Sequence, residues 1–180
     1  MKLKELYSKQ VKPALKEQFK VKNDLAVPRI LKISLNVGVG RFSKDKSYIE
    51  GVVNSITRIT GQKPVLTKAK KSISAFKVRE GMIIGVAVTL RGDRMYDFLE
   101  KLINVTFPRV RDFRGIDPKK MDKTGNLSIG FKEHLAFPEI KADEVDNLHG
   151  LEVNVTTSAQ TYEQGLALFT LLGFPFKKDN

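Results

Sequence analysis

The chain has 180 residues and a formal net charge of +12, a length that suits a single domain whose surface is basic. It is 41% hydrophobic, so it has enough apolar side chains for a core, and it has no Cys, which excludes disulfides, thiolate nucleophiles and Cys-ligated metal sites. No apolar run approaches the ~20 residues of a membrane-spanning helix, and lysines interrupt the first twenty residues where a signal peptide would be apolar, so we expect a soluble, cytoplasmic protein with no membrane partner.

The first third of the chain predicts a helix, a strand, a second helix and a short strand. Apolar residues at three- and four-residue steps predict an amphipathic helix over 2–20 despite Pro13. Alternation from Ile30 to Val39 predicts a half-buried strand that ends in glycines. A helix follows over 47–60 with Gly61 as its stop, and residues 64–67 form a short strand.

The middle of the chain contains the most basic segment. Residues 68–82 read KAKKSISAFKVREGM, which predicts a long, mobile basic loop. Residues 83–90 are the most strand-like part of the chain, and 93–105 predict a helix capped by Gly92 and Asp93. We expect residues 107–124, rich in Pro, Gly and charge, to be irregular.

The last third predicts two strands, over 127–131 and 151–157, and a closing helix over 162–172 that stops before Gly173. Helices and strands mix without a repeat or a linker. The predicted fold class is therefore α+β: one domain over 1–180, with a mainly antiparallel sheet and helices packed on one face.

The positive charge is unevenly distributed along the chain. Residues 1–132 carry a net charge of +17, whereas residues 133–180 carry −5. A localised basic excess of this kind favours binding to a polyanion, although a basic surface that serves only solubility is the alternative.

Residues that could perform catalysis are few. His134 and His149 stand alone without metal-ligand spacing, and we interpret each as a surface or packing histidine. The acids Asp143, Glu144 and Asp146 lack the pattern of a calcium loop. Gly38-Val39-Gly40 begins like a dinucleotide fingerprint, but Ser43 replaces its third glycine. We therefore expect no enzymatic activity, catalytic residue, metal, cofactor or small-molecule substrate.

Four segments combine features suited to RNA: LNVGVGRF (35–42), GQKPVLTKAKKSISAFKVREGM (61–82), VTLRG (88–92) and FPRVRDFRG (107–115). Their Arg and Lys side chains suit phosphates, and Asn36, Gln62 and Thr89 suit base edges or 2′-hydroxyls. Phe76 and Phe113 could stack on bases, or could instead belong to the core.

These four segments, with PEI (138–140) and the ending LLGFPF (171–176), resemble the bacterial ribosomal L-five family over nearly the whole chain. The resemblance implies an α+β fold similar to an RNA-recognition fold. It also implies a structural constituent of the large ribosomal subunit that binds 5S rRNA in the central protuberance. It further implies a basic loop that contacts the P-site tRNA, and a bridge to S-thirteen, a protein of the small-subunit head. Large-subunit rRNA and neighbouring large-subunit proteins would be further partners.

The resemblance also assigns residues. The 5S rRNA contacts would fall on Asn36, Gly38, Gly40, Arg41, Gln62, Thr89 and Arg91. The loop that contacts tRNA would use Lys70, Lys71, Ser72, Phe76, Lys77 and Arg79. The charge pattern adds a further set, because acids repel RNA phosphates and suit a basic protein instead. We expect the intersubunit contact to use Arg109, Arg111, Arg114, Asp143, Glu144 and Asp146, with a solvated acidic face as the alternative for the three acids. An RNA-modifying enzyme and another basic nucleic-acid-binding module are the alternatives.

Overall fold

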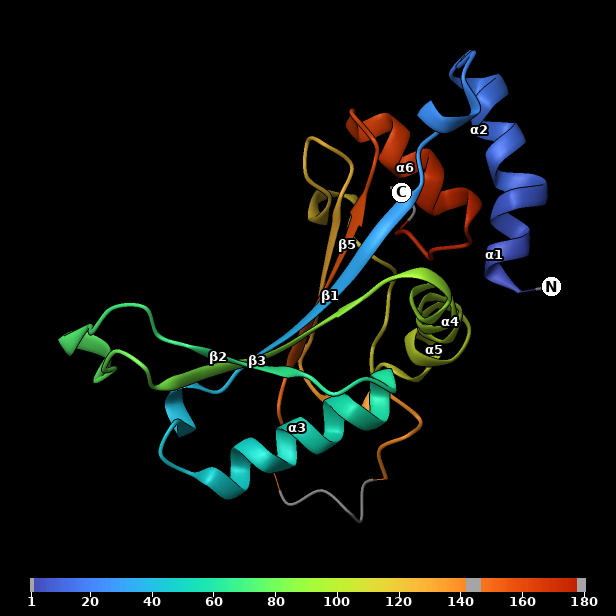
Figure 1. The fold of residues 1–180 in the computed structure, drawn as a ribbon. Helices are drawn as coiled ribbons and strands as arrows, with labels where there is room; N and C mark the ends of the chain where they lie inside the picture. The colour runs from blue at the N-terminus through green and yellow to red at the C-terminus, as the bar shows by residue number, and fades with distance from the viewer. Residues whose placement is uncertain (1, 142–146, 178–180) are drawn as a thin grey trace. The chain divides into compact units, whose positions relative to one another are not determined.

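Five strands form one antiparallel sheet in a computed structural model that describes residues 2–141 and 147–177. The strands are β1 (Ile30–Gly38), β2 (Val65–Lys68), β3 (Ile83–Leu90), β4 (Leu127–Phe131) and β5 (Leu151–Thr157), and their order across the sheet is β2-β3-β1-β5-β4. The sheet and the helices confirm the predicted α+β class (Figure 1). Every predicted strand is present, although β2 begins one residue later than the pattern suggested.

The chain divides into two compact units. The first consists of Met1–Ile33, Leu90–Ile129 and Asn154–Asn180, and the second of Ser34–Thr89 and Gly130–Val153. Each unit is assembled from segments far apart in sequence, so no linker marks a boundary between them. The single domain over 1–180 stays a prediction.

The N-terminal helix is continuous but changes its pitch before Pro13. It begins as α1 (Leu3–Leu6), widens into a π-helical turn over Tyr7–Val11 and continues as α2 (Lys12–Gln18). The N–H of Lys12 donates to the carbonyl of Tyr7, five residues back. Pro13 has no N–H, and a π-turn beside a proline is a common way for a helix to absorb the missing bond.

The helix predicted over 93–105 continues past residue 105, and here too a π-turn precedes a proline. Helix α4 (Gly92–Lys101) passes through a π-turn over Leu102–Thr106 into α5 (Phe107–Arg109), which contains Pro108. The residues 107–109, which we expected to be irregular, are therefore helical.

The expected cap of α4 is wrong. The N-cap residue is Arg91, without a side-chain cap bond. Asp93 lies in the first turn, where its carboxylate accepts from Lys4 Nζ at 2.6 Å. An acid in the first turn is favourable because it faces the positive end of the helix dipole. Each charge is exposed, so this ion pair contributes little to stability.

Helix α3 (Lys46–Thr60) has caps at both ends. Asp45 accepts from the N–H of Tyr48, and Gly61 adopts the left-handed conformation with φ of 67°. Its apolar side chains Ile49, Val52, Ile56 and Ile59 are buried. The second unit also buries Leu35 and Val37 of β1 and Val86 and Val88 of β3.

Helix α6 (Tyr162–Leu171) begins at Thr161, whose hydroxyl accepts from the N–H of Gln164. Gly165 allows it to approach the turn at Gly125, because a Cβ at Gly165 would lie 2.4 Å from the Gly125 Cα. The first unit also buries an aromatic cluster in which Phe113 stacks on Phe107 with ring centroids 5.2 Å apart. Of the two interpretations of Phe113, the structure favours packing.

Candidate nucleic-acid interface

One side of the second unit's part of the sheet is open. In β1, Leu35 and Val37 are buried, whereas Asn36 and Gly38 are exposed. In β3, Val86 and Val88 are buried, and Thr89 is exposed. Because successive strand residues point to opposite faces, these exposed residues share a face with their neighbours two positions along and with the β2 residues paired to them. We call it the open face and define it by Ser34, Asn36, Gly38, Val65, Thr67, Gly85, Ala87 and Thr89. Apart from Val65 at the edge strand, its side chains are small or polar, so a ligand could reach β1 and β3 closely.

Asn36 and Thr67 converge at the centre of the open face. Thr67 pairs with Gly85 across β2 and β3. A Cβ at Gly85 would lie 2.6 Å from Thr67 Oγ1 and 3.6 Å from Asn36 Oδ1. The missing side chain of Gly85 therefore leaves room for two polar groups from neighbouring strands, and the amide of Asn36 stays exposed to a ligand.

Gln62 and Thr89 are joined at the edge of this face. The side-chain Nε2 of Gln62 donates to the carbonyl of Thr89 at 3.2 Å. This bond orients the amide, which is half-buried, and leaves its oxygen as the group that could accept from RNA. Sequence reasoning placed both residues at the interface but did not anticipate that they bond to each other.

Gly38, Gly40 and Arg41 follow one another where β1 ends. Gly40 and Arg41 belong to a 3₁₀ turn over Gly40–Phe42, and Arg41 is exposed. A Cβ at Gly38 would meet no atom within 4 Å, so the absence of a side chain there serves access from outside and not packing. Arg91 belongs to the other unit, where it precedes α4.

The predicted loop over 68–82 is more regular than expected. Ala69 donates to the carbonyl of Met82, and Ile73 and Val78 exchange backbone hydrogen bonds in both directions. A 3₁₀ turn over Ser74–Phe76 reverses the chain, and Lys77 takes a positive φ of 53°. Residues 69–82 thus form a two-stranded extension of β2 and β3, which we call the basic arm (Figure 1).

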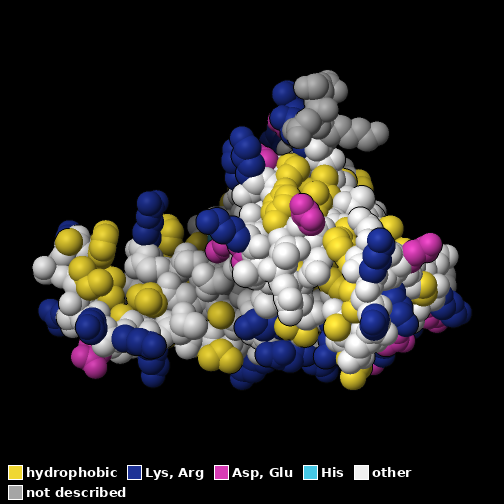
Figure 2. Space-filling view, turned by 90° about the horizontal axis from the view of Figure 1, so that it is seen from above, with side chains coloured by type: hydrophobic (Ala, Val, Ile, Leu, Met, Phe, Trp, Pro, Cys, Tyr) yellow, Lys and Arg dark blue, Asp and Glu magenta, His cyan; other side chains and the backbone are white. Residues whose placement is uncertain are grey.

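Side chains on the basic arm face solvent. The six residues assigned to tRNA contact, Lys70, Lys71, Ser72, Phe76, Lys77 and Arg79, are all exposed. Phe76 is the most exposed aromatic side chain of the described chain, at 75%. Figure 2 shows Lys and Arg side chains alternating with apolar side chains over the arm, at the left of that view. Exposed cations beside an exposed ring suit phosphates and bases together.

The residues assigned to the intersubunit contact are only partly described. Arg109, Arg111 and Arg114 are exposed in the first unit, beside the strained Asp112 with φ of 53°. Asp143, Glu144 and Asp146 lie outside the described residues.

The sequence suggested that the two histidines stand alone, but in the structure they are in contact. His134 and His149 stack with ring centroids 3.8 Å apart and an angle of 5° between the planes. The N–H of His149 donates to His134 Nδ1, and the N–H of His134 donates to the carbonyl of His149. Both are buried, so they are packing residues and not surface residues. The two histidines are 15 residues apart on either side of a loop, so no helix or strand period in the sequence indicated this contact.

Burial governs the charge of the histidine pair. It lowers the pKa of His149 to about 4, with the neighbouring His134 as a second cause, and it also lowers the pKa of His134. Both rings are therefore neutral near pH 7. Among residues 2–141 and 147–177 no three His, Cys, Asp or Glu side chains are grouped to hold a metal ion. Within the same residues no helix has the length and apolar character to cross a membrane.

Comparison with protein families gives two matches that together cover most of the chain. Residues 23–79 match the family described as ribosomal protein L5, and residues 83–176 match the family that describes the C-terminus of the same ribosomal proteins. Similar curated proteins include the large ribosomal subunit protein uL5 of Halothermothrix orenii, which is 52% identical over 98% of each chain. The uL5 proteins of Desulfatibacillum aliphaticivorans and of a Psychrobacter species are 54% and 53% identical over at least 96% of each chain.

These matches define a structural, non-enzymatic protein of the large ribosomal subunit, which acts in translation. The chain belongs to the ribosomal protein L5 family, as the sequence motifs predicted.

Proposed function

We propose that the open face binds 5S rRNA and helps to attach it to the large subunit. The observation that carries the proposal is the convergence of Asn36 and Thr67 over Gly85, beside Gln62 and Thr89. Small residues allow a nucleic-acid backbone to approach the strands, and the amides offer donors and acceptors for base edges or 2′-hydroxyls. Arg41 and Lys68, at the ends of β1 and β2, supply charge for phosphates.

The basic arm serves a second RNA in this proposal. Its cations stand on a backbone extension beyond the sheet, so they reach a ligand that the open face does not hold. We infer that this ligand is the P-site tRNA, which enters and leaves during translation. Exposed phosphate contacts suit a transient ligand because they are individually weak and depend on salt.

The proposal also includes an intersubunit contact with the small-subunit protein S-thirteen. This contact would use Arg109, Arg111 and Arg114 and the acids Asp143, Glu144 and Asp146. The three arginines are exposed. Charge reversal of the three acids should weaken subunit association at low salt and leave 5S rRNA binding unchanged.

The open-face proposal is tested with Asn36→Ala and Gln62→Ala in a filter-binding assay with 5S rRNA at fixed salt. Each change should cost about 1–3 kcal/mol of affinity if the amide reads a base edge. Asn104→Ala is the matched control, because Asn104 is an exposed amide in the first unit. Unchanged affinity in both variants would remove these amides from the interface.

A second assay separates binding from catalysis. Intact, unmodified 5S rRNA recovered from a stoichiometric complex is the expected result, whereas a cleaved or altered strand would favour an RNA-modifying enzyme. Competition with duplex DNA at the same salt concentration tests whether binding is specific to RNA.

A further inference from the structure

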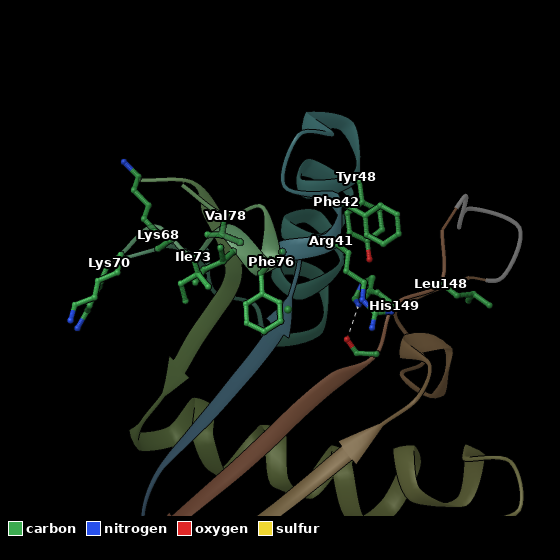
Figure 3. A pocket seen from close by; sticks show the side chains of 16 residues that line it. Arg41, Phe42, Tyr48, Lys68, Lys70, Ile73, Phe76, Val78, Leu148 and His149 are labelled. Carbon is green, nitrogen blue, oxygen red and sulfur yellow. Dashed lines mark hydrogen bonds between the residues drawn. The ribbon is translucent and has the colours of Figure 1, made fainter. Parts of the chain in front are cut away.

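A groove of about 1150 Å³, which the sequence did not predict, lies beside the basic arm. Its walls come from three segments of the second unit: the arm, the turn that leads from β1 into α3, and the loop before β5. Figure 3 shows Ile73, Phe76 and Val78 on the arm side, with Phe42, Tyr48 and His149 on the opposite side.

The groove gathers nearly half of the large apolar side chains that the described residues expose. Of the eleven exposed large apolar side chains, five line it: Phe42, Ile73, Phe76, Ile84 and Leu148. Phe42 is 50% exposed, and its ring lies against Tyr48 with centroids 4.4 Å apart. Exposed apolar surface gathered in one hollow, and not scattered, indicates a binding site.

The rim of the groove is cationic. Arg41, Lys68, Lys70 and Lys71 line it, and no Asp or Glu is among the described residues that do so. Cations around aromatic walls match a ligand with an anionic backbone and flat apolar faces. A peptide segment with that combination would need several acids beside aromatic residues, whereas every unpaired RNA nucleotide has it.

We propose that this groove binds an unpaired nucleotide of RNA, with the base against Phe42 and Phe76 and the adjoining phosphate on Arg41. The inference rests on the proposed RNA-binding function and adds a second, base-stacking site to the open face. A stacking site accepts any base, since every base has a flat face. The groove would therefore anchor a splayed nucleotide, and the open face would read polar edges.

Residues 148–150 form the wall before β5, and His149 ties this wall to the interior of the unit. His149 is only 6% exposed and stacks on His134, so its backbone is fixed against the unit's interior. The opposite wall belongs to the basic arm, where Ile73 and Phe76 are exposed and Val78 is half-buried. One fixed wall and one exposed wall allow a nucleotide to enter from the arm's side.

The chain has no Trp, so Phe76→Trp places a single fluorescent reporter on the groove. Titration of this full-length variant with a single-stranded oligoadenylate of about eight nucleotides should quench the indole emission in a saturable way. An abasic oligomer of the same length should bind about 10-fold more weakly, because it keeps the phosphates and loses the stacking.

Phe42→Ala in the same background should weaken binding of oligoadenylate about 10-fold, and Leu25→Ala should not. Leu25 is the matched control because it is an exposed apolar residue of the other unit. Equal binding of the abasic oligomer, equal effects of the two alanine variants, or anisotropy that reports binding without a change in indole emission would each overturn the proposal.

Binding of 5S rRNA is measured separately, so that failure of the groove proposal and failure of the proposed function can be told apart. If 5S rRNA binds and depends on Asn36 while the groove shows no base-dependent quenching, the groove proposal fails and the proposed function stands. If oligoadenylate quenches through Phe42 while 5S rRNA does not bind, the groove stands and the open-face function fails.

Discussion

The open face and the basic arm both offer polar groups to a ligand, but they hold those groups differently. On the open face, Asn36 and Thr67 sit on paired strands around Gly85, and Gln62 is bonded to Thr89. On the arm, Lys70, Lys71, Lys77 and Arg79 extend into solvent from a backbone that bonds mainly to itself. Neighbouring segments of one unit thus differ in how firmly they hold their polar groups, which is the basis for proposing a resident ligand on the open face and a transient one on the arm.

The largest expected effect tests how tightly the open face is held. Gly85→Val should lower the free energy of unfolding by about 1–3 kcal/mol, because the new side chain overlaps Thr67 and the carbonyl of Val37. Ala87→Val is the matched control, since Ala87 lies on the same face of β3 and is only half-buried. Urea unfolding measures both variants, and equal stabilities would show that the face is looser than the strands suggest.

The buried histidine pair should make the free energy of unfolding depend on pH. The pKa of His149 is lowered to about 4 by burial, whereas the unfolded chain has the ordinary value near 6.5. The unfolded state therefore takes up a proton first as the pH falls, so stability is full above about pH 6.5 and declines toward pH 4, by at most about 1.4 kcal/mol per pH unit for one such group.

Urea unfolding between pH 7 and pH 5 measures this decline, in a range above the ordinary pKa values of carboxylates. The variant His149→Gln should flatten the curve, and NMR titration of the imidazole protons gives the pKa values directly. A His149 signal that titrates near pH 6.5 in the folded protein would contradict the burial argument. The arm contains no His, so its local order should not follow this transition.

The smallest expected effect concerns the arm. Replacing Lys70, Lys71, Lys77 and Arg79 with Gln should change 5S rRNA affinity by no more than about 0.5 kcal/mol, within the range of exposed charge contacts, while translation slows. A control variant with Gln at the exposed residues Lys2, Lys9, Lys22 and Lys177 removes the same charge elsewhere. Loss of 5S rRNA binding in the folded arm variant, with binding kept in the control, would show that the arm belongs to the 5S interface.

Patterns in the sequence were sufficient for the elements that alternate or repeat regularly. From Ile33 onward the burial of β1 follows a period of two, and α3 ends at Gly61 because that position needs a left-handed backbone. The motifs around Asn36, Gln62 and Arg91 identified the family without any structure. In these places local preference and tertiary packing favour the same conformation.

Only the tertiary structure decided which side chains meet. The stacking of His134 on His149, the bond from Gln62 to Thr89 and the groove between Phe42 and Phe76 join residues that are 15, 27 and further apart in sequence. The two π-turns were also hidden, because a proline signals a missing hydrogen bond but not how the helix absorbs it. Sequence periodicity reports which face of an element is buried, whereas contacts between elements depend on how the buried faces pack together.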